Sequence, residues 1–264
     1  MNRPNDTKLK LLLSGWPDGV VLTSKYLKNK GYYKQLIKLY RDKGWIKSLG
    51  RGAYTRLNDT VSWEGAVNAL QFQLDLPLHV GGLTALELVG ISQYSTLNHD
   101  NPKFYLFNSK ENKICLPVWF REYFLNCYVV QTSLFKDDYA IYQKNINGVM
   151  LNIASPERAI LEVLAKVSHF TSLSHANELI ELSDRLRPDV MQRVLESCKS
   201  IKVKRLFLYL ADRNALSFYK DLNQNRIELG KGKRVICQGG TYVAKWMISL
   251  PSLDDYDNMG ENNV

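Results

Sequence analysis

The sequence contains little of what an exported, membrane-bound or metal-dependent protein needs. Its four cysteines, Cys115, Cys127, Cys198 and Cys237, form no CxxC pair that would hold zinc or carry out redox chemistry. We therefore expect isolated buried thiols in a reducing compartment. No apolar run approaches the roughly 20 residues needed to span a bilayer, and Met1–Asp6 has no apolar region of the signal-peptide type. These absences predict a cytoplasmic protein without a membrane partner.

The sequence also lacks the common catalytic motifs. There is no GxSxG nucleophile elbow, and His169 and His175 do not have the HExxH spacing of a metal site. One nuclease-like pattern is present, Asp100 followed by Glu111 and Lys113, in which two carboxylates would hold a metal and a lysine would contact a phosphate. Because Glu111 and Lys113 lie in a polar segment typical of a surface turn, we expect no catalytic residue, no cofactor, no metal site and no enzymatic activity.

Acidic residues are scarce in the first quarter of the chain. Residues 1–61 contain thirteen Lys and Arg but only four Asp and no Glu, a net charge of +9 that equals the charge of the whole protein. Residues 62–264 are balanced, with 22 basic and 22 acidic residues. A small basic segment beside a neutral remainder is the electrostatic pattern of a module that binds a polyanion.

The local pattern of this basic segment is that of a winged helix-turn-helix. Thr23 stands at the N-cap of an amphipathic stretch over Ser24–Asn29, and a second helical pattern spans Tyr32–Lys43. Trp45–Leu57 then has the pattern of two strands joined by the tight turn Gly50–Gly52. Short helices followed by a basic hairpin would place a recognition helix in the major groove and a wing beside it.

The exposed side chains of the second helix and the hairpin are the candidate DNA contacts. Gln35 can pair with adenine through two hydrogen bonds, Lys34 or Lys38 can contact guanine or phosphate, and Arg51 can enter a minor groove or hold a phosphate. A solvated basic helix face would carry the same charges, and winged helices also bind proteins, so both alternatives stay open. The candidate DNA-binding residues are Tyr32, Tyr33, Lys34, Gln35, Lys38, Arg41, Lys47 and Arg51.

The remainder mixes helical and strand patterns, which places the whole chain in the α+β class. Helices are expected over Trp63–Phe72, Gly81–Gly90, a segment capped by Ser155, Ser174–Arg185, Pro188–Cys198, Lys202–Arg213 and Ala215–Lys220. Strands are expected over Lys103–Asn108, Cys127–Thr132, Tyr139–Gln143, Gly148–Ile153, Arg226–Leu229 and Gly240–Leu250. We predict a winged helix-turn-helix domain over residues 1–60 and a larger mixed α/β domain over residues 61–264. The larger domain could divide near residue 154 into a mixed part and a mainly helical part.

A second basic cluster lies within the neutral remainder, over residues 199–234. Such a run is usually a solvated surface. The alternative is a docking surface for nucleic acid or for an acidic protein, with the candidate residues Lys202, Lys204, Arg205, Lys231, Lys233 and Arg234.

The order of these motifs resembles the AbiEi-like antitoxins of bacterial type IV toxin–antitoxin (abortive infection) systems. The segments that carry the resemblance are Lys43–Tyr54, Gly82–Gly90, Ser155–Ala159, Leu229–Arg234 and Gly240–Val243. The resemblance implies a winged helix that binds inverted repeats in its own promoter and represses the operon. It also implies a C-terminal region that counters a nucleotidyltransferase-like toxin without forming a stable complex with it.

Two other functions remain open at this stage. A plain transcriptional regulator would use the larger domain to sense a ligand or to dimerise. A metal-dependent nuclease would use Asp100, Glu111 and Lys113.

Overall fold

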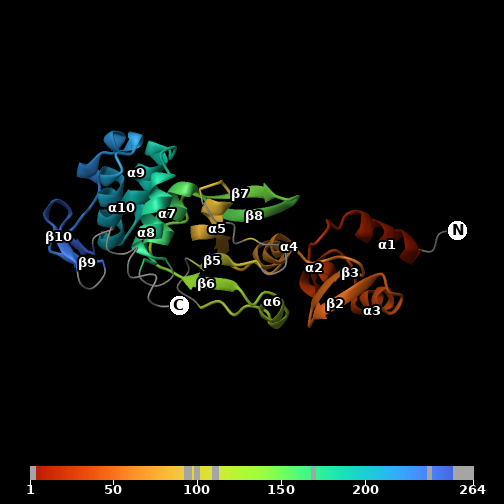
Figure 1. Ribbon diagram of the computed structural model, residues 1–264. Helices are drawn as coiled ribbons and strands as arrows, with labels where there is room; N and C mark the ends of the chain where they lie inside the picture. Colours follow the sequence, from red (N-terminus) through yellow and green to blue (C-terminus); the bar gives the residue numbers. More distant parts are fainter. Residues whose placement is uncertain are drawn as a thin grey trace.

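Three parts follow one another along the chain and from one end of the molecule to the other (Figure 1). The winged helix, coloured red to orange, lies at one end, a five-stranded sheet occupies the middle, and a group of helices with a small sheet lies at the other end. The computed structural model describes residues 4–91, 97, 102–108, 113–167, 171–236 and 240–251. Among these residues, no helix is both long and apolar enough to cross a bilayer.

The first part has the winged helix-turn-helix that the sequence predicts. β1 pairs with β3 and β3 pairs with β2, all antiparallel, so that β2 and β3 form the wing. The predicted second helix is α3, which begins two residues later than expected because Tyr33 is still extended, with φ −80° and ψ 161°. The elements are α1 (Pro4–Ser14), β1 (Leu22–Thr23), α2 (Ser24–Asn29), α3 (Lys34–Asp42), β2 (Ile46–Gly50) and β3 (Ala53–Arg56).

Local signals explain where these helices begin and end. The side chain of Thr23 accepts a hydrogen bond from the backbone nitrogen of Tyr26, which caps α2. Gly31 and Gly44, which follow α2 and α3, adopt the left-handed region with φ of 81° and 73°. The sequence therefore determines these boundaries through contacts between near neighbours.

The middle part is a mixed sheet with helices packed against it. The strand order is β6-β5-β4-β8-β7, in which β5–β6 and β4–β8 are parallel and β4–β5 and β7–β8 are antiparallel. The expected strands β5 and β6 and the expected hairpin β7–β8 are confirmed, whereas β4 and α6 were not predicted. The elements are α4 (Trp63–Asn68), the π-helix η1 (Ala69–Gln73), β4 (Leu78–Val80), α5 (Gly82–Glu87), β5 (Phe104–Asn108), α6 (Val118–Tyr123), β6 (Cys127–Gln131), β7 (Ile141–Ile146) and β8 (Val149–Ala154).

The last part is mainly helical and ends in a three-stranded sheet of order β10-β11-β9. The four expected long helices are confirmed as α7 to α10. The strand expected over residues 226–229 is wrong, because a 3₁₀ turn occupies residues 224–226, and the expected final strand is two antiparallel strands. The elements are α7 (Pro156–Leu164), α8 (Leu173–Glu181), α9 (Pro188–Ser197), α10 (Ile201–Arg213), the 3₁₀ helices η2 (Ser217–Asp221) and η3 (Gln224–Arg226), β9 (Arg234–Val235), β10 (Thr241–Val243), the 3₁₀ helix η4 (Ala244–Trp246) and β11 (Ile248–Leu250).

Buried residues of all three parts form one continuous apolar core. It extends from Trp16 and Leu27 in the winged helix through Phe104 and Leu151 in the sheet to Phe207 in α10. The winged helix is therefore packed onto the rest of the molecule over a shared apolar surface.

The cysteines differ in exposure. Cys198 is buried and Cys127 is half-buried, and burial raises the pKa of these thiols to about 11 and about 12. Both thiols are therefore protonated at neutral pH. Cys115 is exposed, which corrects the expectation of buried thiols, and Cys237 lies outside the described residues.

The π-helix η1 connects the winged helix to the sheet through two glutamines. The side chain of Gln73 accepts a hydrogen bond from the backbone nitrogen of Thr23 at 2.8 Å and donates one to the carbonyl of Val21 at 2.8 Å. The side chain of Gln71 accepts a hydrogen bond from the backbone nitrogen of Asn152 in β8 at 2.9 Å and donates one to the carbonyl of the same residue at 3.1 Å. η1 is therefore hydrogen-bonded to both neighbouring parts.

Two glycines bring backbones of the first and middle parts into direct contact. A Cβ atom on Gly65 in α4 would lie 2.2 Å from the carbonyl oxygen of Gly19. A Cβ atom on Gly50 at the end of β2 would lie 2.8 Å from Cβ of Trp119 in α6. Such distances leave no space for a side chain, so these glycines determine how closely the winged helix and its wing approach the middle part.

Candidate nucleic-acid interface

α3 buries one face and presents the other to solvent. Leu36, Ile37 and Tyr40 are buried and hold the helix on the core. No side chain caps its first turn, so the backbone amides of Lys34 and Gln35 are available to an anion, whereas that of Leu36 donates to the carbonyl of Tyr33. The predicted residues on the exposed face are Tyr33, Lys34, Gln35, Lys38 and Arg41.

The tip of the wing presents a further cation. Arg51 is exposed between Gly50 and Gly52, whose φ values of 152° and 80° few other residues adopt. The carbonyl of Gly52 accepts a hydrogen bond from the backbone nitrogen of Ser24 at 2.8 Å, which ties the wing to α2. α3 and the wing therefore belong to one basic module, in which the wing is anchored at its tip to the start of α2.

Two of the predicted contacts donate hydrogen bonds to backbone carbonyls inside the protein. The hydroxyl of Tyr32 donates to the carbonyl of Lys8 at 3.2 Å, and partial burial, followed by the neighbouring Tyr26, raises its pKa. The ammonium of Lys47 donates to the carbonyl of Asp59 at 3.1 Å. Both residues are half-buried, so they contribute less to the exposed face than the other six.

Three of the four acidic residues of the first quarter lie outside α3 and the wing, and the fourth, Asp42, is the last residue of α3 and lies 3.8 Å from Arg41. Arg56, at the base of the wing, forms ion pairs with Asp59 and Asp18, and its hydrogen bonds to these carboxylates, with that to Asp59 the stronger, raise its pKa. Lys25 pairs with Asp75 of the middle part. These ion pairs neutralise Arg56 and Lys25, which lie outside α3. The exposed face of α3 therefore keeps a net positive charge.

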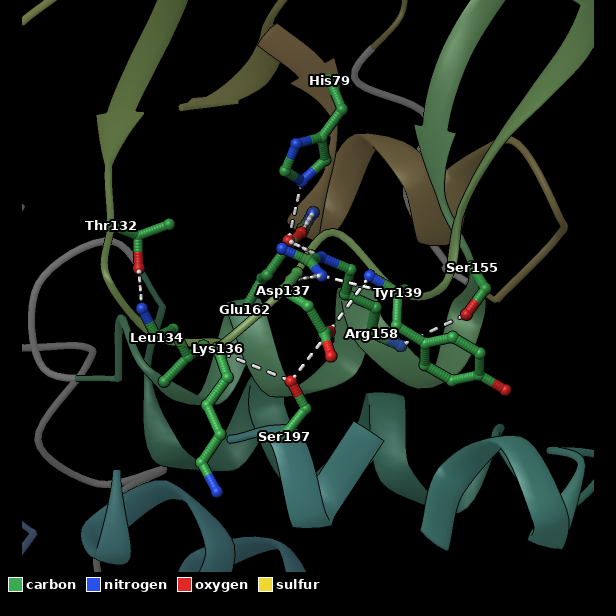
Figure 2. Close-up of polar contacts among 11 residues, drawn as sticks. His79, Thr132, Leu134, Lys136, Asp137, Tyr139, Ser155, Arg158, Glu162 and Ser197 are labelled. Atoms are coloured by element: carbon green, nitrogen blue, oxygen red, sulfur yellow. Dashed lines mark hydrogen bonds and ion pairs between the residues drawn. The ribbon is translucent and has the colours of Figure 1, made fainter. Parts of the chain in front are cut away.

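A buried ionic cluster joins the sheet to the helices, and sequence reasoning missed it (Figure 2). Nε2 of His79 in β4 lies 2.8 Å from Oε1 of Glu162 in α7, and Nε of Arg158 lies 3.1 Å from the same oxygen. The backbone nitrogen of Gly82 donates to the other carboxylate oxygen at 3.0 Å. His79, Arg158 and Glu162 are at most 2% exposed. The cluster is closed to solvent and therefore has a structural role rather than that of an open site.

The same cluster explains why two glycines, Gly81 and Gly82, stand at the start of α5. A Cβ atom on Gly81 would lie 2.3 Å from Oε2 of Glu162 and 2.6 Å from the ring of Phe107. Burial alone would raise the pKa of Glu162, but His79 and Arg158 together hold it below its ordinary value. The glycines therefore allow a charged carboxylate to reach the start of α5.

Arg158 extends the cluster to the segment between β6 and β7. Its Nη1 donates to the carbonyls of Asp137 and Tyr139 at 3.1 and 2.8 Å, and its guanidinium lies 4.1 Å from the ring centre of Phe135. Ser197 of α9 donates to the carboxylate of Asp137 at 2.9 Å (Figure 2). Nothing in the sequence marks this role, because the charged residues of α7 have the spacing of an ordinary solvated helix face, whereas the structure buries every residue from Glu157 to Leu164.

The predicted C-terminal basic surface requires a correction. Lys204 and Arg205 are 2% and 1% exposed, so neither can belong to a docking surface. α10 is covered on the side of these residues by the chain that follows it, and Lys202 donates to the carbonyl of Ile236 at 2.9 Å. Lys231 and Lys233 are exposed and Lys202 and Arg234 are half-exposed, so these four of the six remain candidates for binding a partner.

The nuclease-like pattern falls mostly outside the described residues. Asp100 and Glu111 are not described, and Lys113 is exposed in a segment without regular secondary structure. In the part of the chain that the structure describes, no group of three or more His, Cys, Asp or Glu is placed to hold a metal ion.

Comparisons with known proteins give two family matches that together cover most of the chain. The model described as "Transcriptional regulator, AbiEi antitoxin, Type IV TA system" matches residues 102–251. The model described as "Transcriptional regulator, AbiEi antitoxin N-terminal domain" matches residues 5–97. This second range continues beyond the winged helix through α5, in agreement with the close packing between these elements. No curated protein matches the chain.

One similar solved structure is the crystal structure of the RV2827C protein from Mycobacterium tuberculosis. It aligns with a TM-score of 0.64 and 12% sequence identity, over 97% of this chain and 94% of that chain. At this identity, the similarity shows a shared fold over the full length.

Proposed function

The chain belongs to the AbiEi antitoxin family, the transcriptional regulators of type IV toxin–antitoxin systems, and we propose from this that it has two activities. It represses its own operon by binding inverted repeats in promoter DNA through the winged helix. Its C-terminal region counters a nucleotidyltransferase-like toxin without forming a stable complex with it. Neither activity is enzymatic, and neither requires a cofactor or a metal.

The observation that best supports DNA binding is the exposed basic face of α3, in the same module as the exposed Arg51. Gln35 and Lys38 lie on this face, which begins at an uncapped helix N-terminus, and Arg51 lies at the tip of the wing. A helix with this polarity suits the major groove, and an arginine on a wing suits a minor groove or a phosphate.

Promoter binding can be tested by gel shift with the upstream DNA at several salt concentrations. Lys38→Ala and Arg51→Ala should each reduce the slope of log K against log salt by about 0.9, the value for one lost phosphate contact on duplex DNA. Gln35→Ala should relax base preference at one position, at a cost of roughly 1–3 kcal/mol. Lys220→Ala, which removes an exposed charge in η2, is the control. Slopes that stay at the wild-type value in both basic variants would show that another face binds DNA.

The antitoxin activity can be tested by expressing the neighbouring toxin and measuring rescue of growth. Promoter binding without rescue would instead identify a plain regulator whose larger part senses a ligand or dimerises. A metal-dependent nuclease would lose activity in Glu111→Ala, whereas we expect this variant to repress and rescue as the wild type does.

A further inference from the structure

We propose that the loop over Gly230–Arg234 binds phosphate groups of an RNA that carries unpaired bases. This inference deepens the antitoxin half of the proposed function and rests on it, because it names the ligand of the exposed part of the C-terminal basic cluster. The loop lies beside β9 and β10, at the end of the molecule opposite the winged helix (Figure 1).

The buried guanidinium of Arg205 holds this loop through hydrogen bonds to its backbone carbonyls. Its nitrogens donate to four backbone carbonyls: to Leu229 at 2.9 Å, Gly230 at 3.0 Å, Gly232 at 2.7 Å and Met247 at 3.2 Å. All of these partners are neutral, and within the described part of the chain no carboxylate pairs with Arg205. A buried positive charge therefore lies beneath the loop without a counter-ion, which favours an anion on the other side.

The orientation of these carbonyls determines where the amides point. A trans peptide is planar, so each N–H points away from the carbonyl of the preceding residue. Because the carbonyls of Leu229, Gly230 and Gly232 point inward to Arg205, the N–H groups of the residues that follow them, Gly230, Lys231 and Lys233, point outward. None of them donates a hydrogen bond within the described residues. Gly230 and Gly232 have φ of 59° and 78°, and loops with recurring left-handed residues and outward amides bind anions.

The side chains of the loop place further positive charge near these amides. Lys231 and Lys233 are exposed and Arg234 is half-exposed, and none of the three forms an ion pair in the part of the chain that the structure describes. Outward amides, ammonium groups without a carboxylate partner and a buried guanidinium together suit a phosphate better than a carboxylate, because a phosphate offers more acceptor oxygens.

An exposed aromatic ring beside the cations indicates which phosphate compound fits. Tyr242 on β10 is 45% exposed, and Nζ of Lys233 lies 4.8 Å from its ring centre. A phosphate site beside an open aromatic ring suits a strand in which a base can stack on the ring while its backbone contacts the cations. The bases of a duplex are stacked on one another, whereas RNA loops and single strands present unpaired bases.

The test is fluorescence anisotropy with the full chain and a labelled single-stranded RNA of about 12 nucleotides, a length within the range of single-strand sites. Both the reference protein and the variants carry Lys38→Ala and Arg51→Ala, which weaken binding by the winged helix. In this background, Lys231→Ala with Lys233→Ala should lower the salt slope by about 1.4, at about 0.7 for each contact on a single strand. Tyr242→Ala should weaken binding about 5- to 150-fold, and Tyr242→Phe should retain it.

The matched control is Lys199→Ala with Lys220→Ala, which removes the same charge from exposed positions of the same part. The proposal is overturned if the control weakens binding as much as the loop variant, or if RNA does not bind at low salt. It is also overturned if ATP or an acidic peptide displaces the RNA at equal concentration. Single-stranded DNA of the same sequence shows whether the ribose hydroxyls contribute.

Growth rescue measured on the same variants separates this proposal from the proposed function. If the loop variant loses rescue although the wild type never binds RNA, the antitoxin function stands and the RNA inference fails. If RNA binding depends on the loop while rescue does not, the RNA site stands and its assignment to toxin neutralisation fails.

Discussion

Glu162 is the residue on which the junction between sheet and helices depends. Its carboxylate contacts His79, Arg158 and the backbone nitrogen of Gly82, which belong to β4, α7 and α5. A buried ion pair is weak evidence of net stabilisation, but removing one partner leaves the other charge buried without compensation. The consequence of losing this carboxylate is therefore large even though the cluster binds no ligand.

We expect Glu162→Gln to lower the free energy of unfolding by about 3–5 kcal/mol at pH 7, because Arg158 loses its counter-charge. The pKa of Glu162 in the folded protein is held below its ordinary value of 4.5. Its contribution to stability is therefore complete above about pH 4.5 and is lost as the pH falls toward the depressed folded-state pKa. The difference between wild type and variant should narrow over this acidic range.

Urea unfolding between pH 7 and pH 3 measures this difference. Glu122→Gln, at an exposed position in α6, is the control and should follow the wild type at every pH. A wild-type advantage that stays constant down to pH 3 would show that the charge of Glu162 does not stabilise the fold.

At the scale of elements, the π-helix η1 is the piece that joins the winged helix to the sheet. Gln71 and Gln73 are two positions apart, so their side chains leave η1 in different directions. Gln73 hydrogen-bonds the outer edge of β1, which has no strand neighbour there, and Gln71 bonds β8. A single short helix thus satisfies backbone groups on both of its sides.

We expect Gln73→Ala to leave the backbone N–H of Thr23 without a partner, at a cost of about 1–3 kcal/mol. Hydrogen exchange should show this as faster exchange of the Thr23 amide, with little change in α10 at the other end of the molecule. Gln35→Ala, on the exposed face of α3, is the control and should leave this exchange unchanged. Equal protection of Thr23 in wild type and Gln73→Ala would mean that the glutamine does not hold β1.

The sequence predicts those elements whose signals are local. The cap Thr23 and the turn Gly50–Gly52 act within a few residues, so the helices and the wing could be found without the rest of the fold. β4 could not, because its three residues, Leu78–Val80, are too few to show a periodic pattern. Its position in the centre of the sheet depends on pairing with β5 and β8, which are distant in the sequence.

The candidate sites follow the same division. The exposed residues of α3 could be identified because the spacing of Leu36, Ile37 and Tyr40 defines the buried face of a single helix. The burial of Lys204 and Arg205 could not be predicted, because it depends on the chain after residue 228 folding over α10. Composition alone does not distinguish the buried Lys204 and Arg205 from the exposed Lys231 and Lys233.

At the scale of the whole molecule, the two basic regions with exposed cations lie at opposite ends, separated by the sheet (Figure 1). The continuous core and the contacts of Gly65 and Gln73 argue against cutting the chain near residue 60. A fragment without the winged helix would expose apolar surface and lose the partners of Gln73. The two proposed activities are therefore best separated by surface substitutions in the full chain.

We expect such substitutions to produce opposite phenotypes. Lys38→Ala with Arg51→Ala should lower the promoter salt slope by about 1.8, for two lost phosphate contacts, and derepress a promoter reporter while growth rescue is retained. Lys231→Ala with Lys233→Ala should lose growth rescue while promoter repression is retained, because these lysines lie on the other end of the molecule. Each protein must be expressed from an unrelated promoter, so that loss of autorepression does not change the amount of antitoxin. If either pair of substitutions abolishes both activities while thermal unfolding is unchanged, the two ends act together, and rescue requires binding at both of them.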